Sequence, residues 1–384
     1  MSHAPANEGE LAEMVAESDE PLRIIGGATK RLLGQVCQGT DLTTSGINGV
    51  VTYEPSALTL IVRAGTKLSE IEQLLAENGQ RLEFEPINYS RILQSAGEAT
   101  IGGVVACNLS GPRRIQVGAC RDFMLGVRFV EGHGRLIKSG GRVMKNVTGL
   151  DLTKLMAGSY GTLGIVTEVA LKVMPRPETV ADVALHDLSD GEAIRALSTA
   201  LGSPFAVSGA AHVPSRKLTL LRVEGTEASV TYRLAKLAQL LGPMGQAEIR
   251  LDARKVTADW LDIRDVAEFA NQSGNVWRIS VRPSVGPALV EVLRRKLPGI
   301  AAIYDWGGGL IWLKVPETER SQDVAIRREI GNLGGGHATL VRADVETRKT
   351  VAVFQPMSAG IDRINVGLRQ RFDPRRLFNR GIMN

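Results

Sequence analysis

At 384 residues the chain is long enough for two domains of ordinary size, and its 43% hydrophobic and 23% charged residues are typical of a globular protein. The formal net charge of +5 is spread along the sequence without a block of like charges, and aromatic residues make up only 4%. These values argue against a nucleic-acid-binding protein, because they indicate neither a basic patch nor a surface for stacking bases.

The cysteines and the N-terminal segment bear on the cellular compartment in which the protein is expected. The three cysteines, Cys37, Cys107 and Cys120, show no CxxC spacing, which argues against a disulfide framework or an iron–sulfur site. The first twenty residues are polar and acidic, unlike a signal peptide, and no apolar stretch approaches the ~20 residues that span a bilayer. We therefore expect a cytoplasmic protein without direct membrane insertion, any contact with the inner membrane being made through partners.

The first eighty residues predict an α+β pattern. Residues 8–18 read as a helix with Leu11, Met14 and Val15 on one face, and PLRIIGG reads as a short strand that enters a glycine turn. Two further strands in residues 49–66 are separated by a turn at Glu54–Pro55–Ser56, and residues 67–80 form the clearest helix, with Gly79 just past its end. Strand, strand and helix in this order favour an α+β fold over a parallel repeat.

Glycine becomes dense between residues 97 and 165, where it alternates with apolar residues. This pattern indicates repeated close approach of the backbone to something flat or bulky. PRP at residues 175–177 reads as a boundary, and the following residues mix amphipathic helices with strands, as in a separate α/β domain.

Several common site motifs are absent from the sequence. It contains no GxGxxG after a strand, no GxxxxGK[ST], no HExxH and no GxSxG, and its five histidines lack pairwise ligand spacing. These absences argue against a Rossmann dinucleotide site, a P-loop, a metal site and an α/β-hydrolase.

What remains is a set of glycine-rich segments. In GGATK, residues 26–30, the glycines permit positive φ, so that successive N–H groups could form an anion-binding nest; a plain tight turn is the alternative. The segment ATIGGVVACN could also be a binding loop, and a simple strand bend is the alternative. For GSYGTLGIVTEV the alternative is a simple turn that leads into a strand. Each segment alone is a weak signal.

Taken in order, the segments resemble the FAD-binding fold of the vanillyl-alcohol-oxidase (PCMH) type. The resemblance rests on IIGGATK, YEPSALTLIVRAGTKLSEIEQLL, GEATIGGVVACNLSGPRR, RDFMLGVRFV, KNVTGLDLTKLMAGSYGTLGIVTEVALKVMPRP and the terminal FDPRRLFN. Together with VWRIS, DWGGGLIWLK and GGHATLVRA, these segments resemble in particular the FAD-binding E subunits of bacterial glycolate oxidases.

The resemblance implies an α+β architecture in three parts. Residues 5–178 would form a PCMH-type FAD-binding domain of two α+β subdomains, and residues 179–350 an α/β cap domain with an antiparallel sheet. Residues 351–384 would form a C-terminal segment that returns toward the FAD domain.

The resemblance also implies a cofactor site made of three segments. The first, at the pyrophosphate, consists of Gly26, Gly27, Ala28, Thr29 and Lys30. The second is a flavin-contacting loop with Thr100, Ile101, Gly102 and Gly103, followed by Asn108 and Gly111. The third, along the ribose and adenine, consists of Gly158, Ser159, Gly161, Thr162, Gly164, Ile165 and Val166. Asp151 matches a position that organises this third segment, and a helix cap is its alternative role.

Two departures from the family pattern bear on function. Relatives that attach FAD covalently present a histidine in the first glycine loop, where this chain has Ala28 and Thr29, so we expect non-covalent FAD. The larger catalytic relative carries histidines around a GDGN-like segment, and this chain has no such cluster. Arg278 is a weak candidate for binding a substrate carboxylate and His337 for a catalytic base; an ion pair and a structural histidine are the alternatives.

The resemblance implies the FAD-binding subunit of a glycolate oxidase (2-hydroxy-acid dehydrogenase) complex. The complex would oxidise glycolate to glyoxylate and pass electrons through flavin to an iron–sulfur subunit, beside a larger FAD-containing catalytic subunit. Because the acid–base and metal groups are missing, we expect this chain to carry electrons or structure rather than turn over substrate. Two alternatives stay open: a self-sufficient FAD-dependent oxidoreductase in which Arg278 and His337 converge over the flavin, and a scaffold subunit that has lost FAD.

Overall fold

The computed structural model describes residues 3–141, 150–317 and 322–383, and it divides into two compact units. The first unit comprises Met1–Ser110, Ala119–Arg176 and Pro356–Asn384, and the second comprises Gly111–Gly118 and Pro177–Gln355. The grouping of Gly111–Gly118 with the second unit interrupts the chain order, and the domains expected from the sequence did not contain this interruption. Residues 145–149 of the KNVTGLD segment lie outside the described residues.

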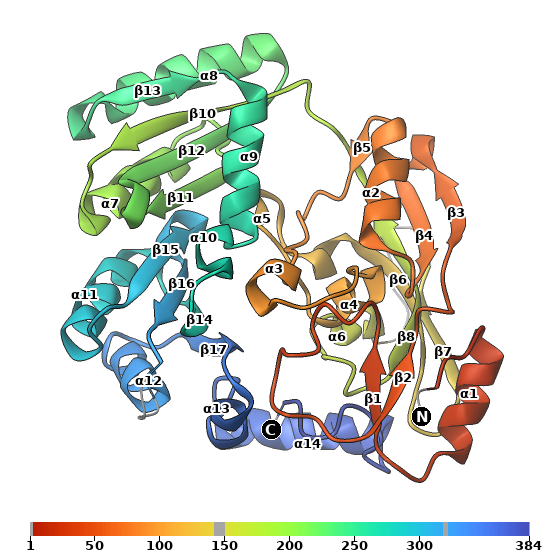
Figure 1. Ribbon diagram of the computed structural model, residues 1–384. Helices are drawn as coiled ribbons and strands as arrows, with labels where there is room; N and C mark the ends of the chain where they lie inside the picture. Colours follow the sequence, from red (N-terminus) through yellow and green to blue (C-terminus); the bar gives the residue numbers. More distant parts are fainter. Residues whose placement is uncertain (1–2, 142–149, 318–321, 384) are drawn as a thin grey trace. The chain divides into compact units, whose positions relative to one another are not determined.

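The first unit combines short helices with three small sheets (Figure 1). An antiparallel five-stranded sheet has the order β3-β4-β8-β6-β7, β1 pairs with β2 in parallel, and β5 pairs with β9. The elements are α1 (Glu8–Glu17), β1 (Leu22–Ile25), β2 (Thr40–Thr43), β3 (Val50–Glu54), β4 (Thr59–Arg63), α2 (Leu68–Glu77), β5 (Gln80–Arg81), α3 (Ser90–Leu93), α4 (Ile101–Ala106), β6 (Met124–Val130), β7 (Leu136–Gly140), α6 (Leu152–Met156), β8 (Ile165–Lys172), β9 (Met174–Pro175) and α14 (Ala359–Phe372).

The two ends of the chain share one core in the first unit. Asn7 caps α1, its Oδ1 accepting from the backbone N–H of Glu10 at 3.0 Å, and Leu11 and Val15 bury one face of this helix. They pack in a cluster with residues of β1 and β2 and with Leu377 and Phe378 from the C-terminal segment. Figure 1 shows the blue C-terminal part beside the red strands β1 and β2, and Phe378 forms a parallel bridge to Leu22.

The second unit is built on one antiparallel sheet of eight strands in the order β13-β10-β12-β11-β15-β16-β14-β17. Its elements are α5 (Arg114–Val117), β10 (Thr179–His186), α7 (Asp190–Leu201), β11 (Gly209–Val213), β12 (Leu218–Gly225), α8 (Glu227–Leu241), β13 (Ala247–Arg250), α9 (Ala253–Arg264), α10 (Ala267–Ala270), β14 (Asn275–Ser280), α11 (Gly286–Lys296), β15 (Ala301–Asp305), β16 (Leu310–Val315), α12 (Asp323–Asn332), β17 (His337–Arg342) and α13 (Val345–Thr350). The predicted α+β class with an antiparallel sheet in the second part is confirmed.

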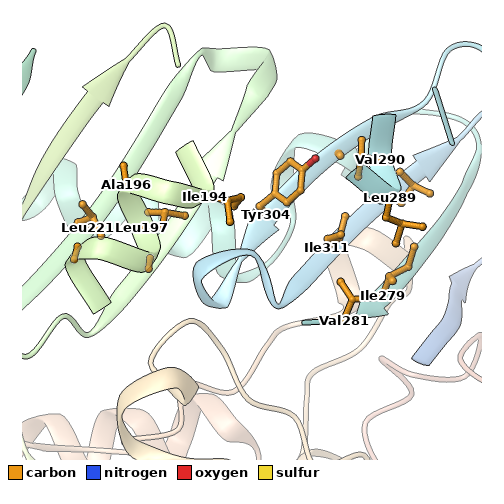
Figure 2. Packing of buried hydrophobic residues seen from close by; sticks show 14 of the residues in the cluster. Ile194, Ala196, Leu197, Leu221, Ile279, Val281, Leu289, Val290, Tyr304 and Ile311 are labelled. Carbon is orange, nitrogen blue, oxygen red and sulfur yellow. The ribbon is translucent and has the colours of Figure 1, made fainter. Parts of the chain in front are cut away.

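One face of this sheet carries the core of the second unit. The helices α7, α8, α11 and α12 contribute to the same buried cluster as alternate residues of the strands, among them Trp277 and Ile279 of β14. Figure 2 shows Tyr304 between Ile194 of α7 and the pair Leu289 and Val290 of α11. Each fully buried aliphatic side chain stabilises the fold by roughly 1.5–3 kcal/mol. Residues at the intervening strand positions, such as Arg278, face the other side of the sheet.

Candidate cofactor site

The GGATK segment follows β1 and lies against the residues that precede α4. A Cβ atom on Gly27 would fall 1.5 Å from the carbonyl oxygen of Glu98, and one on Gly26 would fall 2.3 Å from Oγ1 of Thr100. The left-handed residue of the segment is Ala28, with φ of 61°, and neither glycine is left-handed. The expectation that these glycines supply positive φ is therefore wrong: they are required because another segment approaches too closely for a side chain.

Two further contacts connect the same pair of segments. Oγ of Ser95 donates a hydrogen bond of 2.8 Å to the carbonyl oxygen of Thr29. A Cβ atom on Gly97, which has φ of 101°, would fall 2.1 Å from the carbonyl oxygen of Gly27. Both segments are thus positioned by main-chain contact, and a side chain at either glycine would separate them.

Lys30 brings a cation into this region. A Cβ atom on Gly103 of α4 would lie 3.3 Å from Nζ of Lys30, and Nζ donates a long hydrogen bond of 3.4 Å to Oγ1 of Thr29. Within residues 3–141, 150–317 and 322–383, Lys30 forms no ion pair with a carboxylate. Burial lowers the pKa of Lys30, and burial also raises the pKa of the neighbouring Cys107 thiol to about 11, so the thiol stays neutral. A buried ammonium without a counter-ion favours the binding of an anion.

Thr100–Gly103 begin a helix, and the expectation of a loop at these residues is wrong. α4 starts at Ile101, which is fully buried, and Thr100 occupies the position before it. A Cβ atom on Gly102 would fall 2.7 Å from Cβ of Ala64 and 2.9 Å from its carbonyl oxygen. Glycine at this position therefore lets α4 pack directly on the backbone that follows β4.

The third predicted segment docks on the end of α4. The backbone N–H of Gly158 donates to the carbonyl oxygen of Val105 at 3.1 Å, and that of Tyr160 donates to Ala106 at 2.8 Å. Gly158, Tyr160 and Gly161 are left-handed, with φ of 84°, 53° and 68°. The structure thus brings all three predicted segments together around α4 in the first unit.

Two hydroxyl groups of the third segment serve the segment itself. Oγ of Ser159 donates to the carbonyl oxygen of Met156 at 2.9 Å, and Oγ1 of Thr162 donates to that of Ser159 at 2.7 Å. A ligand can therefore use these oxygens only as acceptors while both bonds are made. A Cβ atom on Gly164 would fall 2.7 Å from Cδ2 of Phe129, which makes Gly164 a packing requirement.

The remaining predicted residues of the first unit have structural contacts. Asp151 caps α6, its carboxylate accepting from the backbone N–H of Lys154 at 3.2 Å, which is the alternative role considered for it. Ile165 and Val166 begin β8, are 1% and 7% exposed, and pair with Val130 and Phe129 of β6. Asn108 is left-handed, with φ of 48°. Its Oδ1 accepts from the backbone N–H of Arg121 at 3.0 Å.

Asn379 is a residue of this region that sequence reasoning missed. Its Oδ1 accepts from the backbone N–H of Ile24 at 2.8 Å, and its Nδ2 donates to the carbonyl oxygen of Tyr160 at 2.7 Å. This side chain therefore connects the strand before the first segment with the third segment. Asn379 is the last residue of the terminal FDPRRLFN, which belongs to the family resemblance. The resemblance assigned no role to this residue.

Three predicted residues belong to the second unit. The carbonyl oxygen of Gly111 accepts from Nε1 of Trp306 at 3.1 Å, and the Arg278 guanidinium lies 5.0 Å from the centroid of the same ring. In the sheet, His337 pairs with Ser280, which lies two residues after Arg278 on β14. Arg278 and His337 are therefore on the same face of the sheet. Gly111 is placed with them and not with the rest of the predicted site.

Neither a metal centre nor a membrane span is found in the part of the chain that the structure describes. In that part, no three His, Cys, Asp or Glu side chains are grouped so that they could ligate a metal. None of the helices described there is long and apolar enough to cross a bilayer.

In the DWGGG turn, Oδ1 of Asp305 accepts from the backbone N–H of Trp306 at 2.7 Å, so this carboxylate caps the turn.

Comparison with known protein sequences finds an FAD-binding family. The family described as "FAD binding domain" matches residues 3–140. Glycolate oxidase subunit GlcE of Escherichia coli (strain K12) is 38% identical over 365 residues, which cover 94% of this chain and 92% of that protein. Glycolate oxidase subunit GlcD of Bacillus subtilis (strain 168) is 32% identical over 201 residues, or 50% of this chain and 40% of that protein. A D-lactate dehydrogenase of Anaerostipes hadrus is 30% identical over 164 residues, which cover 42% of this chain and 31% of that protein.

Comparison with solved structures supports the same fold. A structure of alkyldihydroxyacetonephosphate synthase matches with a TM-score of 0.69, covering 98% of this chain and 76% of that chain. The sequence identity is 16%, so this likeness concerns the fold alone. FAD is accordingly the cofactor of this chain.

Proposed function

Because the chain belongs to the family of glycolate oxidase subunit GlcE, whose members are FAD-linked oxidoreductases, we propose that it is the FAD-binding subunit of a glycolate oxidase (2-hydroxy-acid dehydrogenase) complex. The complex oxidises glycolate to glyoxylate and passes electrons on to an iron–sulfur subunit. A larger FAD-containing catalytic subunit is its other partner. We place the chain in the cytoplasm, with any contact with the inner membrane made through these partners.

The observation that carries the proposal is the ammonium of Lys30, whose pKa is lowered by burial and which forms no ion pair in the described residues. Its Nζ lies next to Gly103, where no side chain intervenes, and beside the segment that begins at Gly26. The FAD pyrophosphate would be the counter-ion of this ammonium, since charge-assisted hydrogen bonds between ammonium and phosphate are among the strong ones. The residues present therefore fit the cofactor.

We assign the three segments separate tasks. Gly26–Lys30 bind the pyrophosphate, Thr100–Gly103 form a wall of the site, and Gly158–Thr162 follow the ribose with their main chain. FAD, when bound, supplies an acceptor for two electrons, and the chain supplies binding and orientation. Because Ala28 and Thr29 stand where relatives attach FAD to a histidine, the cofactor is held without a covalent bond.

Substrate turnover belongs, in this proposal, to the larger partner subunit. A hydride abstraction from a 2-hydroxy acid needs a base for the hydroxyl proton and a cation for the carboxylate. In the described residues no group of ligands could hold a metal that would share this work. The chain therefore acts as an electron-carrying or structural flavin subunit.

A self-sufficient oxidoreductase is a second candidate, favoured by one observation. Arg278 and His337 lie on the same face of the sheet of the second unit, where a cation and a base could serve one substrate. Replacing Arg278 with Ala and, separately, His337 with Ala would abolish flavin reduction by glycolate if this candidate holds. Both variants would leave the function of an electron-carrying subunit intact.

The spectrum of the purified chain tests the proposal. We expect a yellow protein that glycolate does not bleach under anaerobic conditions, and whose flavin is released into solution by denaturation. Bleaching by glycolate alone would establish the self-sufficient enzyme. A colourless chain that takes up no FAD on reconstitution, yet still binds its partner subunits, would establish a scaffold. Flavin that stays with the denatured chain would contradict non-covalent binding.

A further inference from the structure

The first unit contains a pocket that adjoins the third cofactor segment through Thr162 and is otherwise lined by the C-terminal part of the chain. Residues lining it include Thr162, Arg369, Asp373, Arg376, Arg380 and Met383. Lys30 is not part of its wall. The pocket is formed mainly by the end of α14 and the turn that follows it.

Three arginines, Arg369, Arg376 and Arg380, line this pocket. Arg369 donates one hydrogen bond of 3.2 Å to the carbonyl oxygen of Met383. Burial lowers the pKa of Arg369, and the nearby charge of Arg376 lowers it further. In the described parts of the chain, the side chains of Arg376 and Arg380 form no hydrogen bond and no ion pair. Like charges that face one space favour an anion within it.

The one carboxylate in the pocket wall is already committed. Asp373 is 3% exposed, and its two oxygens accept from the backbone N–H groups of Leu377 at 2.9 Å and Phe378 at 2.8 Å. Burial raises the pKa of Asp373, which these two hydrogen bonds oppose. The carboxylate therefore organises the turn through both oxygens, and its charge also interacts with that of Arg376, one of the three arginines.

The backbone keeps one of the arginines in a strained conformation. Arg376 has φ of 55°, in the region that favours glycine, and its N–H donates to the carbonyl oxygen of Asp373 at 3.0 Å. A glycine could close the same turn without strain. An arginine at this position indicates a use for the side chain, because strained residues concentrate at binding sites.

We propose that this pocket binds a phosphate group. A phosphate offers several oxygens and up to two negative charges to three guanidinium groups, whereas a carboxylate offers two oxygens and one charge. The phosphate can come from a soluble ligand, such as pyrophosphate or a nucleotide, or from FAD. The inference does not depend on the glycolate oxidase assignment.

In the test, the full chain loaded with FAD is titrated with pyrophosphate in low-salt buffer, and calorimetry measures the binding. The variants are Arg376→Gly, which also relieves the strained φ, Arg380→Ala and the double variant. Arg363→Ala, an exposed arginine of α14 outside the pocket wall, is the matched control. We expect each pocket variant to weaken binding about tenfold. We also expect the control to bind as the native chain does, and added salt to weaken binding.

A second measurement identifies the source of the phosphate. If pyrophosphate does not bind the FAD-loaded chain, and the double variant releases FAD more readily than the Arg363→Ala control at equal melting temperature, FAD itself provides the phosphate. The inference is overturned if pyrophosphate binds all variants equally. It is also overturned if pyrophosphate does not bind and the double variant retains FAD as the control does.

Discussion

Asn379 accepts a hydrogen bond of 2.8 Å from the backbone N–H of Ile24, 355 positions earlier in the chain. Its Nδ2 donates to the carbonyl oxygen of Tyr160, and a Cβ atom on Gly161 would fall 2.8 Å from this nitrogen. Asn379 is 6% exposed. One buried amide therefore sets the distance between the strand that leads into GGATK and the segment that contains Gly161.

Replacing Asn379 with Ala should lower the free energy of unfolding by about 1–3 kcal/mol, because two half-buried backbone groups lose their partner. The same change should lower the flavin content, since the first and third segments are no longer joined. Urea unfolding and the ratio of flavin to protein absorbance measure the two effects. Asn78→Ala, at an exposed helix end, is the control. Native flavin content in Asn379→Ala would contradict a role of this amide in the site.

Gly27 allows a test of close approach. Replacing Gly27 with Val should abolish FAD retention, because its Cβ would fall 1.5 Å from the carbonyl oxygen of Glu98 and force the two segments apart. Ala at the same position should already reduce retention, since even one methyl group does not fit. Gly360→Ala is the control: this helical glycine has open space around it, and alanine there should stabilise α14 by up to about 1 kcal/mol. Equal flavin content in Gly27→Val and the native chain would refute the assignment.

The elements that depend on local sequence were predictable. The apolar spacing in α2 and the glycine after it predicted a helix over residues 67–80, and the structure has α2 at Leu68–Glu77 with φ of 62° at Gly79. Glu54–Pro55–Ser56 marked the turn between β3 and β4. In each case the neighbours in the chain determine the conformation, so the pattern is visible in a single window of sequence.

The parts that depend on distant contacts were not predictable. The left-handed residue of GGATK is Ala28, and the two glycines are required because Glu98 and Thr100 occupy the space beside them. Gly111–Gly118 group with the second unit, where Arg113 forms a buried ion pair of 2.7 Å with Glu224. No pattern within either segment carries this information, since the partner lies roughly 70 to 110 positions away in the chain.

Lys30→Met should have opposite effects on the free protein and on cofactor binding. The buried ammonium destabilises the apo chain, and methionine of similar length removes this charge, so the free energy of unfolding of the apo chain should rise at pH 7. FAD affinity should fall about 10- to 100-fold, since a charge-assisted contact with phosphate is lost. Chemical unfolding of the apo chain and titration with FAD measure the two effects.

The pH dependence of Lys30 has a defined sign. Its pKa is lowered in the fold from 10.5, so the unfolded chain binds more protons between the two values, and stability rises with pH in that window. The apo advantage of Lys30→Met should therefore be complete below the folded pKa and shrink as the pH approaches 10.5. Lys236→Met, at an exposed lysine, is the control. Equal FAD affinity in Lys30→Met and the native chain would remove the main support for the pyrophosphate assignment.

Asp190 is a half-buried charge of the second unit with three partners. Tyr304 donates its hydroxyl to Oδ2 of Asp190 at 2.8 Å, Arg294 pairs with the same oxygen at 2.9 Å, and Nε2 of His212 lies 3.4 Å from Oδ1. Burial opposes ionisation of Asp190, but the contact with His212, the hydrogen bond from Tyr304 and the charge of Arg294 outweigh it and lower the pKa to about 2. These contacts join α7 and α11 to the sheet.

Replacing Asp190 with Asn should therefore cost about 2 kcal/mol of unfolding free energy at pH 7, the order expected for a shift from 3.8 to about 2. A lowered carboxyl pKa stabilises the fold above the unfolded value and loses this effect as the pH falls through the folded value. The difference between the native chain and Asp190→Asn should thus be constant above pH 5 and shrink as the pH falls from about 4 toward about 2. Urea unfolding at a series of pH values measures this difference, with Asp362→Asn, at an exposed position of α14, as the control. A difference that stayed constant down to pH 2 would show that Asp190 contributes packing and not charge.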